Sequence, residues 1–165
     1  MKPLFVALFC LTAFACSNSP SNIPPSTERF VENLLEGRKP ENNYKKEAMV
    51  CLEGLTNPEE ATRKYYFRVV PLLIKNTDPN EELSARIGSN LTEYLKQYPV
   101  ELANQFHELP PEEKTHIGAV ISIHFMTRFT PDETIKHFFD ELSSKCSNEK
   151  EKENLLELKE KVFHP

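Results

Sequence analysis

The feature that most constrains the fold is the spacing of apolar residues after position 27, which recur every three or four positions. This period places them along one side of an α-helix, whereas a half-buried strand needs a period of two. The clearest stripe consists of Leu83, Ile87, Leu91, Tyr94, Leu95 and Tyr98. Because no segment shows a strand pattern, the sequence predicts an all-α domain of about eight short helices.

Helix starts are marked by a recurring local pattern. Asn57, Asp78 and Thr130 are each followed directly by proline, with a glutamate three positions after the first residue. An Asn, Asp or Thr oxygen can accept from a free backbone N–H, proline suits the first turn, and the glutamate can bond back. The pattern predicts three helix N-termini. A fourth start is expected in the charged run that begins at Asn148, which we interpret as solvated, with a charged docking face as the alternative.

Two further segments carry specific expectations. Residues 117–126 are apolar nearly all round, so this helix is predicted to form the buried centre of the domain. Pro71 lies within the apolar run 69–74, where it removes one helical hydrogen bond, and we expect it to kink that helix rather than end it.

The arrangement of the helices follows from the short links between them. Helices joined by turns of about two to six residues pack antiparallel against their neighbours. Two architectures fit this pattern, an irregular helical bundle and a small solenoid resembling HEAT repeats. The sequence shows no self-similarity at a fixed period that would decide between them.

The N-terminus has the form of an export signal. Lys2 precedes an apolar run at 4–15, which has the length of a signal peptide and is too short to span a bilayer. The run ends in Ala13-Phe14-Ala15-Cys16, with small residues where signal peptidases require them. This arrangement resembles the lipobox of bacterial lipoproteins, which implies cleavage between Ala15 and Cys16 and acylation of Cys16. The alternative is ordinary signal cleavage before a free Cys16.

The chain is therefore divided into three parts: a signal peptide at 1–15, a flexible lipid-proximal tether at 16–26 and a single helical domain at 27–165. The tether is rich in Ser, Asn and Pro and has too few apolar residues to fold. The lipoprotein resemblance implies a protein anchored to the bilayer through Cys16. Ser17 directly after that cysteine implies, for an enteric bacterium, the outer membrane facing the periplasm.

The expected domain contains two cysteines, Cys51 and Cys146, both on apolar stripes. In an exported protein two cysteines suggest one disulfide, which would stabilise the fold by closing a long loop. The alternative is two separate buried thiols, because free cysteine is common in protein cores.

The sequence predicts no catalytic residue, metal site or cofactor, because it contains no Gly-x-Ser-x-Gly, Walker or His-Glu-x-x-His motif. His116 and His124 lie too far apart on one helix to share a metal. The net charge of −5 argues against a nucleic-acid partner. The aromatic run 65–67 points in three directions around a helix, so at least one ring is expected near the surface, where it could anchor a protein partner. The alternative role for these rings is packing beneath a neighbouring helix.

These observations favour a protein-binding or adaptor module held at the membrane by its lipid. Assembly factors and immunity proteins both fall within this class. One alternative is a hydrolytic enzyme acting on cell-envelope substrates, with a pocket around His124 or His116. Another is a structural component of the envelope.

Overall fold

In the computed structural model, the described residues are 20, 23–40, 44–78 and 81–165. Within them the secondary structure comprises nine α-helices and one short 3-10 helix, without a strand. The prediction of an all-α fold is confirmed. The elements are α1 (Pro25–Leu35), α2 (Lys45–Glu53), η1 (Gly54–Thr56), α3 (Glu60–Phe67), α4 (Val70–Asn76), α5 (Glu82–Gln97), α6 (Pro99–His107), α7 (Pro111–Thr127), α8 (Asp132–Ser143) and α9 (Glu149–Phe163).

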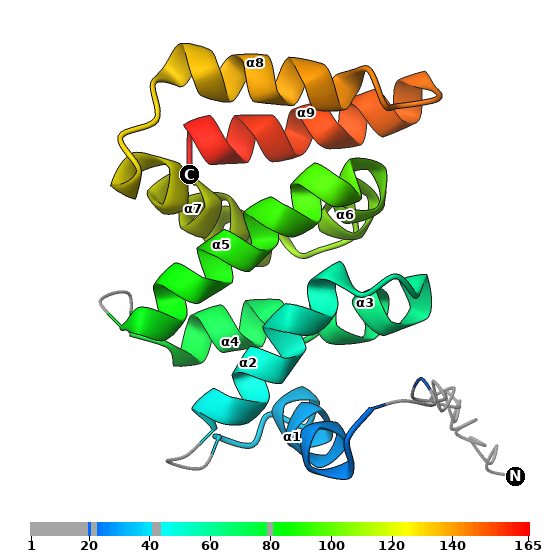
Figure 1. Ribbon diagram of the computed structural model, residues 1–165, viewed down its shortest axis with the longest axis vertical. Coiled ribbons are helices and arrows are strands. Elements are labelled where there is room, and N and C mark those ends of the chain that lie inside the picture. The colour runs from blue at the N-terminus through cyan, green and yellow to red at the C-terminus, as the bar shows by residue number, and fades with distance from the viewer. Residues whose placement is uncertain (1–19, 21–22, 41–43, 79–80) are drawn as a thin grey trace, which may run out of the picture.

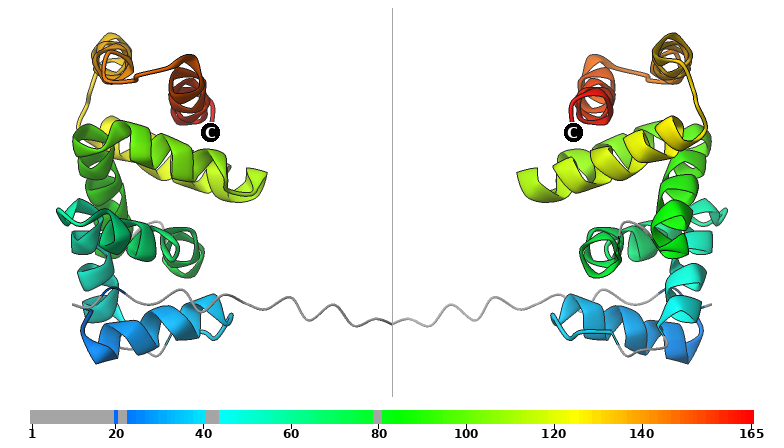
Figure 2. Two further views of the ribbon diagram at one scale, coloured as in Figure 1. Left: turned by 90° about the vertical axis from the view of Figure 1, so that its right-hand side faces the viewer. Right: turned by 90° about the vertical axis from the view of Figure 1, so that its left-hand side faces the viewer.

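The helices form a stack with α1 at one end and α8 and α9 at the other (Figure 1). The most extensive contacts join helices two or three places apart in the chain, namely α5 with α7, α7 with α9, and α6 with α9. Figure 2 shows from the side that the first and last helices lie at opposite ends. Packing between near neighbours in the sequence is the arrangement of a solenoid, so the fold resembles the second of the two expected architectures.

The core runs continuously through the stack. The predicted stripe on α5 is buried at Leu83, Ile87, Leu91, Tyr94 and Leu95. Tyr94, Phe106 and Phe139 are among the largest fully buried side chains. Because each large apolar side chain contributes roughly 1.5–3 kcal/mol when buried, these positions hold α5, α6 and α8 in place.

Helix α7 differs from its prediction. Ile117 and Ile121 are fully buried, but Ile123 is 49 % exposed and Met126 is 68 % exposed. The expectation that this segment forms the buried centre of the domain is therefore wrong for one side of the helix. The reason is that α4, α5 and α9 pack against α7 and leave the remaining side near its C-terminus uncovered.

Pro71 also differs from its prediction. α3 ends at Phe67, and a new helix, α4, begins at Val70 with Pro71 in its first turn. The expected kink in one continuous helix is wrong, because the missing N–H of proline costs nothing where a helix has no bond to make. Similarly, α1 begins at Pro25, so the last two residues of the segment expected as a tether belong to the first helix.

The expected helix starts are found close to their predicted positions. α3, α5 and α8 begin at Glu60, Glu82 and Asp132. The Asn57 side chain accepts from the Glu59 N–H at 2.8 Å. Pro79 lies outside the described residues.

At the start of α9, the side-chain oxygen of Asn148 accepts from the Glu151 N–H at 3.0 Å. The Glu151 carboxylate in turn accepts from the Ser147 N–H at 2.6 Å. Each residue therefore satisfies an N–H that the helix end leaves free. The charged run that begins at Asn148 is a helix start, as expected.

The expected signal peptide, the cleavage position between Ala15 and Cys16, and most of the tether lie outside the described residues. Within the described part of the chain, none of the helices is long and apolar enough to cross a membrane.

Candidate binding groove between α3 and α6

A surface groove of about 720 Å³ lies between α3 and α6, and the end of α5 and Lys145 complete its wall. We call this cavity the α3–α6 groove. Its volume lies within the range of small-ligand and peptide pockets, about 300–1,000 Å³. Both signs of charge line it. The cations are Lys64, Arg68 and Lys145, and the anions are Glu60, Glu101 and Glu108.

Helix α3 forms one wall of the groove with side chains that recur every four residues. Glu60, Lys64 and Arg68 lie one turn apart and therefore share a face of the helix. Lys64 forms an ion pair with Glu60 across one turn, and both side chains are more than half exposed. This wall is therefore accessible to a ligand, and its charges are screened by water.

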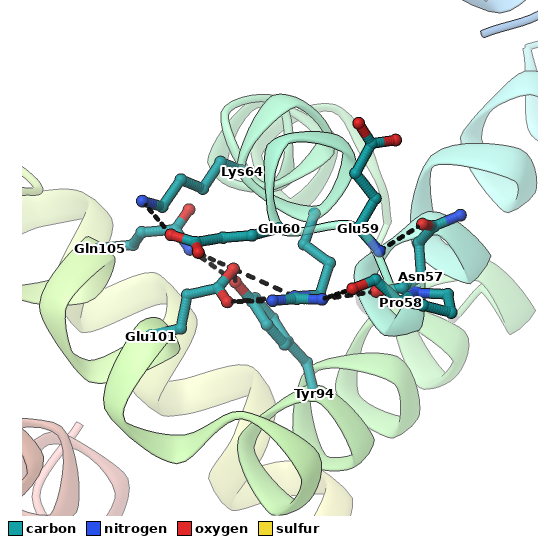
Figure 3. A network of polar contacts seen from close by, with 9 residues as sticks. Asn57, Pro58, Glu59, Glu60, Lys64, Tyr94, Glu101 and Gln105 are labelled. Atoms are coloured by element: carbon teal, nitrogen blue, oxygen red, sulfur yellow. Dashed lines mark hydrogen bonds and ion pairs between the residues drawn. The ribbon is translucent and has the colours of Figure 1, made fainter. Parts of the chain in front are cut away.

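Behind the groove lies a buried ion pair between Arg63 and Glu101 (Figure 3). The Arg63 Nε donates to both Glu101 oxygens at 3.1 Å, and a terminal nitrogen donates to Oε2. The other terminal nitrogen donates to the carbonyl oxygens of Asn57 and Pro58 at 2.7 and 2.9 Å. The guanidinium thus joins α6 to the loop that precedes α3.

Two further side chains complete the network around Glu101. The Tyr94 hydroxyl on α5 donates to the Glu101 carboxylate at 2.7 Å. Gln105, one turn after Glu101 on α6, donates to the Tyr94 hydroxyl. The Arg63 guanidinium also lies over the ring of Tyr98, 3.6 Å from its centroid, in cation–π geometry. Three helices and one loop therefore meet at a single carboxylate.

The electrostatics of the network favour the ionised pair. Burial lowers the pKa of Arg63, but hydrogen bonds and charge from Glu101 outweigh it, so the guanidinium pKa lies above its ordinary value. Burial, and then the bond to Glu101, raises the pKa of the Tyr94 hydroxyl. Glu101 accepts from three neighbouring side chains, so its oxygens serve to position helices. The network acts as the rigid back wall of the groove.

The part of the groove open to a ligand combines amides with an aromatic edge. Gln97 and Asn104, both exposed, line it together with Tyr98 and Val100. A side-chain amide both donates and accepts, which matches the alternating N–H and C=O groups of a polypeptide backbone. Apolar atoms of Tyr98 and Val100 can cover side chains between those bonds.

The two domain cysteines are not brought together. The structure records both as free thiols, with Cys51 buried and Cys146 half-buried. Cys51 lies on α2 near Glu47 and Tyr66, whereas Cys146 follows α8 near Glu151 and Lys152. The structure therefore contains two separate thiols and no Cys51–Cys146 disulfide, because the two elements lie in different layers of the stack (Figure 1). Burial raises the pKa of Cys51 to about 12.

The aromatic run on α3 is fully covered. Tyr65, Tyr66 and Phe67 are 7 %, 4 % and 3 % exposed. The expectation that at least one ring lies near the surface is wrong, because α3 is enclosed by η1, α2 and α4. Packing beneath neighbouring helices, the alternative role for these rings, describes the structure.

The histidines lie apart from the groove. His124 lines a smaller hollow between α5 and α7, and burial, followed by the charge of Arg128, lowers its pKa. His107 contacts Glu157 at 2.7 Å. Among the residues that the structure describes, no group of three or more His, Cys, Asp or Glu side chains is arranged to hold a metal ion.

Comparisons of the chain with protein-family models, curated proteins and solved structures found no match. The groove therefore has to be interpreted from its own geometry. Its central residues, Arg63 and Glu101, were not singled out from the sequence. The available signal is that Arg63 lies three and four positions before Tyr66 and Phe67, on their buried face, where a charge requires a partner.

Proposed function

We propose that this chain is a lipid-anchored protein of the bacterial cell envelope whose helical domain binds a protein partner. In this proposal the α3–α6 groove receives an extended segment of that partner. The observation that carries it is the rigid back wall, in which the buried Arg63–Glu101 pair fixes the positions of α3 and α6 on either side of an open groove.

The chemistry of the groove supports a polypeptide ligand. Amides line it between charged residues of both signs, with an aromatic ring at one side. A small anionic ligand would favour a wall of cations alone, and an apolar ligand a wall of aliphatic side chains. A peptide segment presents backbone amides, apolar side chains and charges together. Because the back wall is already ordered, the groove itself loses little conformational entropy on binding.

The membrane anchor in the proposal rests on the lipobox-like sequence. Replacing Cys16 with Ser removes the thiol that would be acylated, so the Cys16→Ser protein should move from the membrane fraction to the soluble fraction. An Asn18→Ser variant, which changes the same segment without removing the thiol, should remain with the membrane. Unchanged fractionation of Cys16→Ser would contradict the anchor.

The peptide site can be tested by photo-crosslinking in cells. A photoreactive residue at position 100 should capture a defined partner, because Val100 lines the groove. Introducing Lys64→Glu into the same chain should abolish capture, since it reverses one charge of the groove wall.

The same probe at position 86 is the control. Arg86 is exposed on α5 and outside the groove residues, so a probe there should leave the partner uncaptured. Capture that is equal from positions 86 and 100, or that survives Lys64→Glu, would contradict the site.

A further inference from the structure

Phe129 is the single described residue other than glycine with a positive φ, at 52°, and its side chain is 93 % exposed. It lies two residues after the end of α7, and its N–H donates to the Met126 carbonyl at 3.0 Å. Glycine or asparagine usually occupies such a position, because the left-handed conformation costs other residues roughly 1–2 kcal/mol. The ring contributes almost no burial in return. Folding of the chain therefore gains nothing from phenylalanine at this position.

A hollow of about 230 Å³ lies between α7 and the N-terminal half of α5, and its lining includes Thr127, two residues before Phe129. We call it the α5–α7 hollow. Ala85, Gly88, Val120 and Ile123 supply its apolar surface. At Gly88 an added Cβ would lie 3.0 Å from the Val120 carbonyl oxygen, so the two helices approach closely there. Ile123, which lines the hollow, and Met126, which lies between Ile123 and Phe129 in the sequence, are both exposed apolar side chains.

We propose that the face formed by α5 and α7 binds a second copy of this chain, with Phe129 of each copy inserted into the α5–α7 hollow of the other. A two-fold dimer requires a projection and its complementary recess on the same face, and both lie here along α7. The size also fits, since a cavity of about 150 Å³ already accommodates a benzene ring. This inference concerns a different face from the α3–α6 groove and does not depend on the proposed function.

Charge complementarity favours a second copy as the occupant. Arg128, adjacent to Phe129, is exposed and forms no ion pair within the described residues. Glu81 and Glu82 line the edge of the hollow. They pair with Lys45 and Arg86, and their side chains are 40 % and 81 % exposed, so each can accept a further cation. When Phe129 enters the hollow of the other copy, Arg128 approaches these carboxylates, and the same contact forms twice by symmetry. An anionic lipid surface would instead be repelled by Glu81 and Glu82.

Sedimentation velocity of the full chain in a mild non-ionic detergent tests the dimer. The wild-type chain should pass from monomer to dimer at concentrations up to roughly 100 µM, within the range expected for small interfaces. Phe129→Asn should weaken the dimer about tenfold or more, because it removes two central aromatic anchors. Asparagine accepts the left-handed conformation, so this variant should keep its fold, as circular dichroism will show.

Leu156→Asn is the matched control. Leu156 is another exposed apolar residue, 53 % exposed, but it lies on α9 outside the hollow. Its substitution should change the dimer dissociation constant by less than about twofold, since apolar residues outside an interface do not contribute to it. Equal effects of Leu156→Asn and Phe129→Asn would overturn the proposal.

A charge exchange tests the geometry. Arg128→Glu should weaken the dimer, because it places a third carboxylate against Glu81 and Glu82. Adding Glu82→Arg to that variant should restore association, since the pair then has opposite charges again. A wild-type chain that stays monomeric, a double variant no better than Arg128→Glu alone, or vesicle binding through Phe129 by a monomer would each overturn the proposal.

Discussion

The α3–α6 groove and the α5–α7 hollow use opposite chemistry. At the back of the groove, the Arg63 and Glu101 side chains are only 5 % and 14 % exposed, and they are paired with each other. Beside the hollow, an apolar side chain is exposed and the backbone that carries it is strained. The two exceptions to ordinary burial therefore have different causes. The buried charges determine the position of helices, whereas the exposed ring does nothing for the folded chain and is available for another molecule.

The helices that form the two sites are also held by different means. Arg63 links α3 to α6 through directional bonds to one carboxylate. α7 is held against α9 by close backbone contact at Gly118. The Arg63–Glu101 ion pair joins two helices through long side chains, and it requires both partners. The close contact at Gly118 instead requires that residue to have no side chain. Substitutions can therefore test each link separately.

The largest expected effect follows from removing Arg63. In Arg63→Met, Glu101 stays in its place, where its side chain is only 14 % exposed, without its main partner. Breaking one half of a buried ion pair costs about 3–5 kcal/mol, so the free energy of unfolding should fall by this order in urea titrations. Adding Glu101→Leu should recover much of the loss, because both charges are then gone.

The matched control for this prediction is Lys64→Met. Lys64 forms its ion pair with Glu60 on the exposed face of the same helix, one residue further along. Exposed pairs of this kind contribute about 0–0.5 kcal/mol, so the variant should unfold almost as the wild type does. If Arg63→Met and Lys64→Met cost the same, the buried network does not fix the groove.

The next largest effect is expected at Gly118. A Cβ added there would lie 2.7 Å from the Lys161 carbonyl carbon and closer still to its oxygen, so α7 and α9 would have to separate. Overpacking against backbone typically costs about 1–3 kcal/mol, and Gly118→Ala should lower the free energy of unfolding by that order. The control is Ser122→Ala, which lies on α7 as Gly118 does. Gly37→Ala cannot serve as the control, because the positive φ of 74° at Gly37 would itself strain an alanine. A neutral Gly118→Ala would contradict the close contact.

Much of the fold could be predicted from the sequence because helical periodicity is a local property. The stripe at 83–98 and the starts near Glu60, Glu82 and Asp132 follow from residues within one or two turns. The errors concern neighbours that are distant in the chain. Whether Ile123 or Tyr66 is covered depends on which other helices pack there, and no local pattern contains that information.

The candidate groove could not be predicted for the same reason. Arg63 on a buried helix face indicates that a partner exists, but Glu101 lies 38 residues further along. A single sequence cannot choose this glutamate among its many acidic residues. The unusual conformation of Phe129 could not be predicted either, because its positive φ depends on how α7 ends and not on its own side chain.

A smaller effect of opposite sign is expected at Phe129. Phe129→Asn relieves a left-handed conformation that asparagine tolerates, and it removes almost no buried surface. The free energy of unfolding should rise by roughly 0.5–1 kcal/mol when measured on dilute monomer, where self-association does not contribute. A loss of stability would show that the ring supports the fold, which would remove the contrast between groove and hollow.

The smallest expected effect is a pH dependence of the free energy of unfolding that arises from His124, a lining residue of the α5–α7 hollow. Its pKa is lowered in the folded chain by burial and then by the charge of Arg128. An unfolded histidine takes up its proton near pH 6.5, so below that pH the unfolded chain binds a proton that the folded chain resists. The free energy of unfolding should therefore fall as the pH decreases from about 7 to about 5.

His124→Gln should reduce this slope, because glutamine does not titrate. His137→Gln is the control and should leave the slope in place, since the His137 side chain is exposed. Urea titrations across this pH range measure the slope, and equal slopes for His124→Gln and the wild type would show that the hollow does not desolvate its histidine.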